Sequence, residues 1–180
     1  MLNDRVLNYL HLHLIVFICG FTAILGALIT IGAEALVWYR MSIAVVLMFI
    51  YVRFIKKEEL VFPPKVLAKF LLGGFLISAH WLTFFLAIKV SNVSVTLATI
   101  STGAFFASVL EPLFYRRRII YYELLFGLLV VVGLYTMFRV ESGYGLGIVL
   151  ALLAALLSAS FSILNGTLIQ QYKASVISLY

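Results

Sequence analysis

The chain has 180 residues, of which 64% are hydrophobic and only 11% are charged, with a net charge of +6 and a mean hydropathy of +1.16. Soluble domains are about half apolar and about a quarter charged. This composition therefore excludes an ordinary soluble domain, a disordered chain, a collagen, a disulfide scaffold and a coiled coil, and it predicts an all-α polytopic membrane protein.

Long intervals without charged residues define the predicted membrane helices. A helix needs roughly 20 apolar residues to cross the hydrocarbon core. Five such intervals contain no charged residue, and one further segment, at about residues 35–55, is interrupted near its outer end by Arg40. The segments predict about six transmembrane helices, at residues 12–33, 35–55, 69–88, 93–114, 119–138 and 144–166. The loops between them are short, so any functional site is expected between the helices.

Lysine and arginine are distributed unevenly between the two ends of these helices. Two of them, Lys89 and Arg139, lie on the side opposite the N-terminus, together with Glu141. Positive charge in short loops stays cytoplasmic. We therefore expect a multi-pass protein of the cell (inner) membrane with its N-terminus in the cytoplasm and with Lys89 and Glu141 on the outer side. The basic composition is thus a topology signal, and no nucleic-acid partner is expected. The ten residues on the N-terminal side are Arg5, Arg53, Lys56, Lys57, Lys65, Lys69, Arg116, Arg117, Arg118 and Lys173.

The first predicted helix contains the single cysteine, Cys19, so no internal disulfide can form. Its end at residues 33–35 (AEA) resembles a signal-peptide cleavage site, but its apolar run is far longer than the ~7–15 residues of a signal peptide. We therefore expect a retained helix. His11 and His13 are two residues apart and point to opposite sides of a helix. They cannot bind one metal ion together, and no metal or other cofactor is expected.

Arg40 lies inside the second predicted helix, beside Trp38 and Tyr39. A charge at the centre of a membrane helix costs about 2.5–3.5 kcal/mol on insertion scales. One interpretation is that Arg40 extends to the outer headgroups, toward Glu34. The other is that Arg40 is a buried cation that holds an anionic substrate group or pairs across helices.

His80 lies near mid-membrane in the third predicted helix, next to Trp81. A histidine that faces the interior of a bundle is a candidate proton carrier. A hydrogen-bonded packing histidine is an equally good interpretation. Both residues are candidates for the substrate pathway or for proton coupling.

The fourth predicted helix is more polar than a membrane anchor requires. Thr99, Gly103 and Glu111 lie on one face because they are spaced by four and eight residues. A hydroxyl often bonds its own helix backbone, so each one alone carries little weight. Two interpretations stay open: Thr99 and Thr102 line a substrate pathway, or the helix is tightly packed at these positions. The hydroxyl residues are Ser94, Thr96, Thr99, Ser101, Thr102 and Ser108.

Glu111 precedes Pro112 near the end of this helix, just before Arg116. It is interpreted either as an interfacial carboxylate paired with the arginine run 116–118 or as a site for a proton or a substrate amine. The second interpretation rests on Pro112, which leaves a backbone carbonyl unpaired one turn back. Glu123 lies closer still to the arginines and is interpreted as structural.

The sixth predicted helix carries small residues at a spacing of four, which lets two membrane helices approach closely. Ser158, Ser162 and Asn165 add polar groups to it. Close packing is one interpretation of the helix, and lining of a polar path by these three residues is the other. The two rows are Gly143, Gly147, Ala151, Ala155 and Ala159, and Ala154, Ser158, Ser162 and Gly166.

Four segments follow one another in an order typical of a known family. Residues 38–44 (WYRMSIA) form a tryptophan/arginine motif, and residues 84–98 (FFLAIKVSNVSVTLA) join an alanine-containing helix end to a small-residue helix start. Gly127 and Gly133 lie in the fifth predicted helix, and residues 145–155 (GLGIVLALLAA) open the sixth. In order and spacing, these segments resemble EamA-type transporters of the drug/metabolite transporter superfamily.

The resemblance implies ten helices in two five-helix repeats of inverted topology. It also implies transport of small organic metabolites, such as amino acids, by alternating access. Residues 1–140 would form the first repeat, and residues 141–180 would start the second with one helix. The chain departs from the family at residues 101–104 (STGA), where a proline is common, and at residues 116–118 (RRR), where a glutamate is frequent.

Because only six of the ten helices are accounted for, a missing C-terminal half or a homo-oligomer is an expected partner, besides the lipid bilayer and the small-molecule substrate. An exporter or exchanger is the first interpretation. The alternative is a non-transporting membrane subunit or an inactive truncated fragment, and 180 residues alone are not expected to transport. An intramembrane enzyme is disfavoured, because three histidines and the carboxylates Glu111 and Glu123 form no catalytic cluster.

Overall fold

The computed structural model describes residues 4–140 and 142–180, and the side chains of residues 5–136 and 143–180. Across these ranges all regular structure is helical. The elements are α1 (Asp4–Leu28), α2 (Ala33–Ile50), η1 (Tyr51–Lys56), α3 (Pro64–Val90), α4 (Val93–Ile100), α5 (Gly103–Tyr115), α6 (Tyr121–Val140), η2 (Ser142–Tyr144), α7 (Gly145–Leu168) and α8 (Ala174–Leu179).

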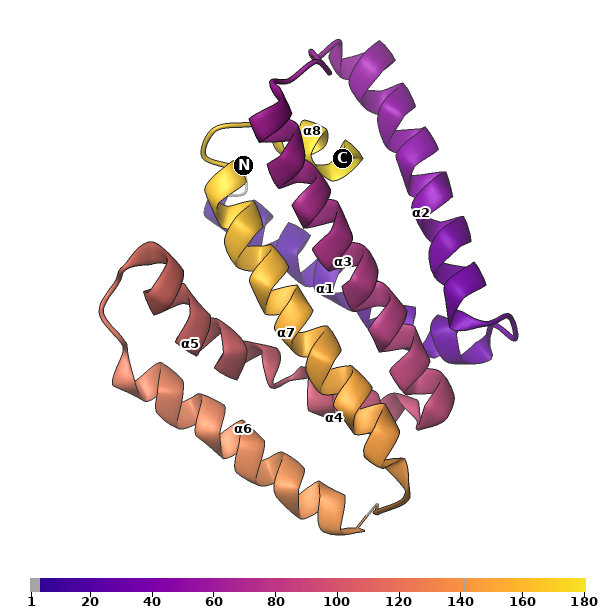
Figure 1. Cartoon of the computed structure of the whole chain (residues 1–180), viewed down its shortest axis with the longest axis vertical. Coiled ribbons are helices and arrows are strands. Elements are labelled where there is room, and N and C mark those ends of the chain that lie inside the picture. Colours follow the sequence, from indigo (N-terminus) through magenta and orange to yellow (C-terminus); the bar gives the residue numbers. More distant parts are fainter. Residues whose placement is uncertain (1–3, 141) are drawn as a thin grey trace.

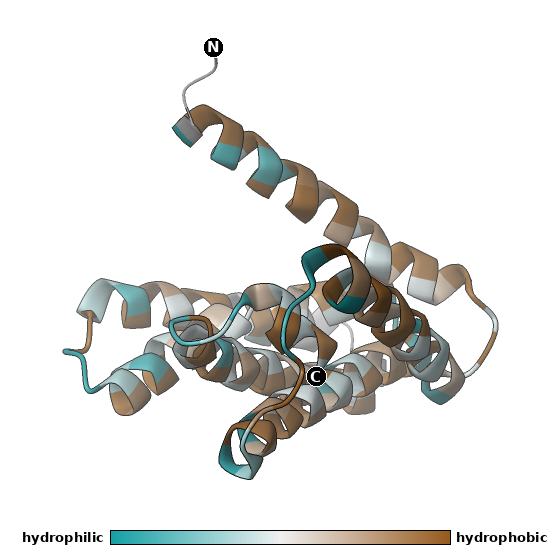
Figure 2. Ribbon diagram, turned by 90° about the horizontal axis from the view of Figure 1, so that it is seen from above, coloured by the Kyte–Doolittle hydropathy of each residue, from teal (hydrophilic) through white to brown (hydrophobic). Residues whose placement is uncertain are grey.

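The expected class, an all-α polytopic membrane protein, is confirmed. Five segments of the described chain are long and apolar enough to cross a membrane. They are α1, α2 continued by η1, α3, α4 continued by α5, and α7, and α6 adds a shorter apolar helix. Hydrophobic residues cover most of α1, as expected for a surface that faces lipid (Figure 2).

Two antiparallel helices, α3 and α7, form the centre of the bundle (Figure 1). Helices α4 and α5 pack on α7, and α6 packs mainly on α5 at the edge of the molecule. Helix α2 packs on α3 and α8. Helix α1 contacts α3 and α4, while its N-terminal half projects away from the other helices (Figure 2).

The small residues of α7 allow this central packing. Ala151, Ala154 and Ala155 are fully buried or nearly so. A Cβ atom added at Gly147 would lie 2.5 Å from the Cβ atom of Ser91 at the end of α3, a distance that real contacts do not reach. At these four positions of α7 the structure agrees with the close-packing interpretation, whereas a Cβ atom at Gly143 would meet nothing within 4 Å.

The fourth predicted helix is broken, which the sequence prediction missed. Helix α4 ends at Ile100 and α5 begins at Gly103. At the break, the Thr102 hydroxyl donates to the carbonyl of Thr99 over 2.7 Å, and the Ser101 hydroxyl donates to the carbonyl of Ala98 over 2.6 Å. These side chains bond carbonyls near the break, and the break needs no proline.

The loops 57–63 and 169–173 lie near α8 at one end of the bundle, which we call the basic end, and the loop 116–120 lies apart from them at the left edge of the view in Figure 1. Lys57 and Arg116, which end η1 and α5, both adopt the left-handed conformation, with φ of 52° and 51°. At the opposite end, Lys89 donates a hydrogen bond to the carbonyl of Ile29 and so ties α3 to the loop after α1.

Several helix ends differ from the prediction. Helix α1 extends from Asp4, whereas the prediction began at residue 12, because its polar first turns continue the helix beyond the apolar run. Helix α3 begins at Pro64 instead of residue 69, and proline is a favoured residue for the first turn of a helix. Glu141, predicted on the side opposite the basic end, lies outside the described residues, as does the Arg139 side chain. The cytoplasmic position of the N-terminus stays a prediction.

Candidate functional site

A cavity of about 500 Å³ lies between α2, α3, α7 and α8. Along α3 it extends from Phe70 to Trp81, which corresponds to about 16 Å at the rise of an α-helix. Its polar lining comes from the side chains of Arg40, Ser78, Trp81, Asn165, Ser178 and Tyr180, and apolar side chains form the remainder. Among the predicted site residues, the structure thus brings Arg40, Trp81 and Asn165 to one cavity.

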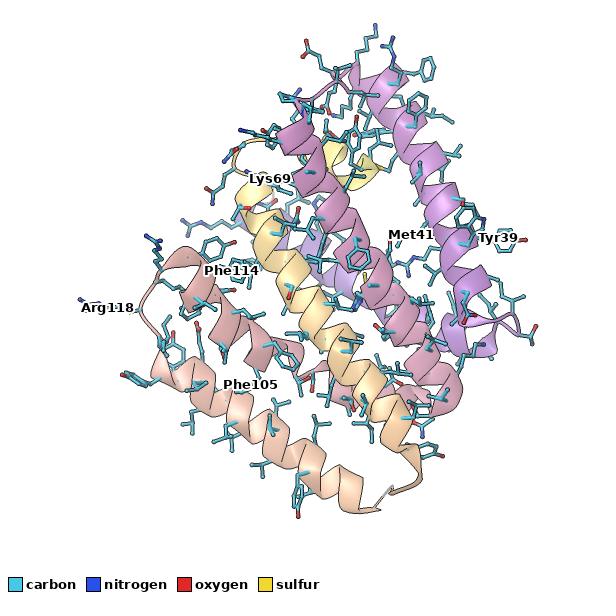
Figure 3. The ribbon with its side chains drawn as sticks, in the orientation of Figure 1. Tyr39, Met41, Lys69, Phe105, Phe114 and Arg118 are labelled. Carbon is cyan, nitrogen blue, oxygen red and sulfur yellow. The ribbon has the colours of Figure 1, made fainter. Side chains whose placement is uncertain are left out.

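Arg40 enters this cavity from α2. Its guanidinium carbon lies 3.5 Å from the centroid of the Trp81 ring, a cation–π contact across the two helices. Arg40 is half-buried and forms no ion pair with any residue that the structure describes. Its side chain therefore points to the interior rather than toward Glu34. Figure 3 shows the same division on α2, with Met41 toward α3 and Tyr39 pointing away from the bundle.

An aromatic cluster on α3 fixes the Trp81 ring. Phe85 stacks on it with ring centroids 5.7 Å apart and planes inclined by 24°. Phe84 meets it edge-on, also at 5.7 Å, and the His80 ring lies 5.0 Å away. The ring that holds Arg40 is thus surrounded by other rings on the same helix.

His80 itself does not line the cavity. It is only 9% exposed, and its Nδ1 atom lies 2.8 Å from the carbonyl oxygen of Ala154 on α7. A carbonyl can only accept, so Nδ1 carries the hydrogen in this contact. The geometry favours the packing interpretation of His80, which joins the two central helices.

Thr99 and Thr102 also lie away from the cavity. Both are fully buried, and their hydroxyls bond backbone carbonyls of their own segment, those of Val95 and Thr99, over 2.7 Å. They shape the break between α4 and α5, which both pack on α7. In this structure, their hydroxyl groups are used by the backbone and not by a pathway.

Glu111 lies in a second cavity, of about 390 Å³, between α5 and α6. The Nη2 atom of Arg117 donates to Glu111 over 2.8 Å and to Glu123 over 2.9 Å. Within the arginine run 116–118, to which the sequence pointed, Arg117 is thus the partner. Arg116 ends α5 in the left-handed conformation, and the chain turns back so that the next residue faces the carboxylates.

The pairing has an electrostatic consequence. The hydrogen bond to Glu123, followed by the one to Glu111, raises the pKa of Arg117 above its ordinary value. The structural interpretation of Glu123 agrees with this geometry. The two carboxylates and the guanidinium together hold the ends of α5 and α6.

Of the polar residues on α7, only Asn165 reaches the first cavity. Ser158 is half-buried and Ser162 is exposed, and neither contributes to the lining. Nearby, the Tyr115 hydroxyl of α5 donates to the carbonyl of Ile163 over 2.7 Å. Gly166 leaves room for that hydroxyl, since a Cβ atom there would lie 2.5 Å from it.

The C-terminal segment lines the cavity at the basic end, a feature that the sequence prediction missed. The Ser175 hydroxyl donates to Glu58 over 2.6 Å, and the Lys173 ammonium lies 3.4 Å from the other oxygen of the same carboxylate. The Tyr180 hydroxyl donates to the carbonyl of Leu60. Glu58 thus ties α8 to the loop between η1 and α3.

Aromatic packing adds to the contacts that hold α8 against α3 and the loop before it. The rings of Phe62, Phe70, Tyr172 and Tyr180 contact one another at centroid distances of 5.2 to 6.1 Å. A Cβ atom at Gly74 would lie 2.8 Å from the backbone oxygen of Tyr180, so this glycine lets α8 approach α3. Two features of the sequence could have indicated this docking of α8: the aromatic residues Tyr172 and Tyr180, and the acidic pair Glu58 and Glu59 in an otherwise basic loop.

The hydrogen bond from Ser175 is the main cause of a lowered pKa at Glu58, and the neighbouring Lys173 acts in the same direction. The carboxylate is therefore ionised at neutral pH. The ionised form accepts the hydrogen bond from Ser175 in α8 and pairs with the ammonium of Lys173 just before α8.

A bundle of apolar membrane-spanning helices around a partly polar cavity is one that can hold a small molecule within the membrane. A model of the EamA-like transporter family matches residues 7–139. The match covers most of the chain, so the chain belongs to this family of drug/metabolite membrane transporters. Neither a curated protein nor a solved structure matches it.

Proposed function

We propose that the chain forms the substrate cavity of a transporter for small organic solutes, with Arg40 and Trp81 at the deep end of the cavity. The observation that carries this proposal is the cavity itself, which holds a cation at membrane depth without a carboxylate partner. Its volume of about 500 Å³ is in the range of small-molecule sites. Polar groups at few positions and apolar walls are typical of such sites.

Transport by alternating access requires the cavity to open to each side in turn. In the present arrangement, α8 and its contacts with Glu58 and Leu60 cover the basic end. On the proposed mechanism, these contacts break when the site opens to that side, which the lysine and arginine distribution predicts to be the cytoplasm. The location would be the inner cell membrane, and export or exchange would be the direction.

We place the boundary between the two repeats at residues 140 and 141, so that α7 opens the second repeat. The end of the family match at residue 139 supports this boundary. The partner would be the remainder of an inverted repeat, from the same gene or from a second copy of the chain. On this proposal, the present chain supplies one wall of the complete site and is not an enzyme.

A flux assay tests the proposal. The chain is reconstituted in liposomes, alone and together with the sequence encoded after Tyr180, and uptake of amino acids and organic acids is measured. We expect flux with the downstream sequence, reduced at least tenfold by Trp81→Leu and unchanged by Trp38→Leu, since Trp38 is 72% exposed on α2 and lies outside the cavity. Absence of flux in both preparations would favour a non-transporting membrane subunit.

A further inference from the structure

We propose that Arg40 binds the carboxylate of the transported solute, so that the substrate class is small monocarboxylates with an apolar body. This inference rests on the proposed transport function and assigns the substrate class of the same cavity. Three features of the cavity carry it: the unused donors of Arg40, the absence of an acidic side chain in its lining, and its apolar walls.

The guanidinium of Arg40 has hydrogen-bond donors to spare. A guanidinium carries five N–H groups in a planar fork that matches a carboxylate. In the described part of the chain, Arg40 contacts the Trp81 ring and donates no hydrogen bond. A charge held at membrane depth by a ring alone is poorly compensated, and a bound carboxylate would supply both the counter-charge and the acceptors.

The lining of the cavity disfavours cations and zwitterions. None of the described side chains that line it is acidic. An ammonium group would therefore find no acidic side chain and would lie in the field of Arg40. The other polar side chains with oxygen atoms, Ser78, Asn165, Ser178 and Tyr180, can offer it only neutral oxygen atoms. An amino acid would bind through one end only, whereas a monocarboxylate leaves no charge unpaired.

The walls beside Arg40 favour an apolar body. Met41, Ala44 and Ile77 line the cavity next to the guanidinium, and Phe161 and Leu164 line it on α7. These side chains offer no hydrogen bonds. A short branched carboxylate would place its charged end at Arg40 and its alkyl end among them.

Trp81 acts in this proposal as a positioning residue. The ring lies against the guanidinium at 3.5 Å and is itself held by Phe84 and Phe85. It therefore fixes the direction in which the fork of Arg40 points. Loss of the ring should reduce the preference for a carboxylate more than it reduces binding of a neutral analogue of the same shape.

The probe is 4-methylpentanoate, compared with 4-methylpentanamide, 4-methylpentylamine and leucine. Binding to the purified chain in lipid nanodiscs is measured by isothermal titration calorimetry. The chain has two tryptophans, so Trp38→Phe leaves Trp81 as the fluorescent reporter of the cavity. We expect the acid to bind about 10- to 100-fold more tightly than the amide, as a charge-assisted pair would give. The amine should not bind, and leucine should bind more weakly than the acid.

The variants separate the anchor from the scaffold. Arg40→Gln should abolish the preference for acid over amide, and Arg40→Lys should retain part of it. Arg53→Gln is the matched control, because Arg53 lies further along the same membrane segment, is exposed and does not line the cavity. Trp81→Leu should lower the acid-to-amide ratio, and Trp81→Phe should restore part of it. The acid-to-amide affinity ratio is measured on folded protein. If Arg40→Gln or Trp81→Leu unfolds, the test uses Arg40→Lys or Trp81→Phe in its place.

Equal binding of acid and amide by the parent chain would overturn the proposal, as would a preference that survives Arg40→Gln. These results can be separated from failure of the transport proposal. A preserved preference without flux in the liposome assay leaves Arg40 as a carboxylate site in a protein that does not transport. Flux of the amide or the amine at the rate of the acid refutes the carboxylate anchor and leaves transport intact.

Discussion

Substitution of Gly147 by alanine tests the central packing of the bundle. Gly147 lies in the first turn of α7, where that helix crosses the end of α3. A Cβ atom at this position would lie 2.5 Å from the Cβ atom and 2.6 Å from the hydroxyl oxygen of Ser91, and 3.3 Å from the backbone oxygen of Ala87. The helices must then separate by about 1 Å to restore an ordinary contact.

The size of the effect follows from two opposing contributions. Overpacking of a close contact costs about 1–3 kcal/mol. Alanine is favoured over glycine inside a helix by about 0.5–1 kcal/mol, which offsets part of that cost. The Ser91 hydroxyl also bonds the carbonyl of Ala87 over 2.6 Å, and a shift of Ser91 would strain this bond. We expect Gly147→Ala to lower the free energy of unfolding by about 1–2 kcal/mol.

The assay is reversible unfolding in mixed micelles, followed by far-UV circular dichroism. Gly133→Ala is the matched control, because Gly133 lies inside α6 and a Cβ atom there would meet nothing within 4 Å. It should leave stability unchanged or raise it slightly. Ser91→Gly should rescue Gly147→Ala, since it removes the two closest atoms. A Gly147→Ala variant as stable as the parent, or a double variant without rescue, would refute the close approach of α3 and α7.

Other contacts lead to further expectations. His80→Phe should cost about 1 kcal/mol of stability through the lost hydrogen bond and leave the pH dependence of transport unchanged, whereas loss of proton-driven uptake alone would restore the proton-carrier interpretation. The lowered pKa of Glu58 means that its ionised form stabilises docking of α8. That contribution is complete above the ordinary glutamate range and is lost as the pH falls through the lowered pKa. The protection of the amides of residues 174–179 against hydrogen exchange, taken relative to the intrinsic exchange rate at each pH, should therefore fall in acid. Glu58→Gln should show the low protection already at neutral pH, and its protection should not change with pH. Arg117→Gln should lower the melting temperature while Arg116→Gln does not, and Glu111→Gln should reduce driven uptake and exchange equally if its role is structural.

Hydropathy was sufficient to predict the membrane helices, because the cost of placing charge in lipid dominates their positions. It could not predict the break at Ser101 and Thr102, since hydroxyl residues are tolerated within a continuous helix as well as at its end. Nor could it assign the partner of Glu111. That choice depends on the left-handed turn at Arg116, which decides that Arg117 points back to the carboxylate.

Arg40 was identifiable from the sequence as an exceptional charge, but the sequence left open whether its side chain extends to the headgroups or to the interior. Its contact with Trp81 required the relative rotation of α2 and α3, which depends on packing rather than on local sequence. The return of α8 to Glu58 joins residues 117 positions apart. Hydropathy read along the chain carries no information on such a pairing.

The central pair of helices has a consequence for the order in which the protein is made. Helix α3 leaves the ribosome before α4, α5 and α6, yet it packs most extensively on α7, which is synthesised after all of them. The early helices must therefore remain in the bilayer, or beside the insertion machinery, with the surfaces that contact α7 uncovered until α7 arrives. Chains released by the ribosome before Leu168 would expose the face of α3 that includes His80, and they would be natural targets for membrane quality control.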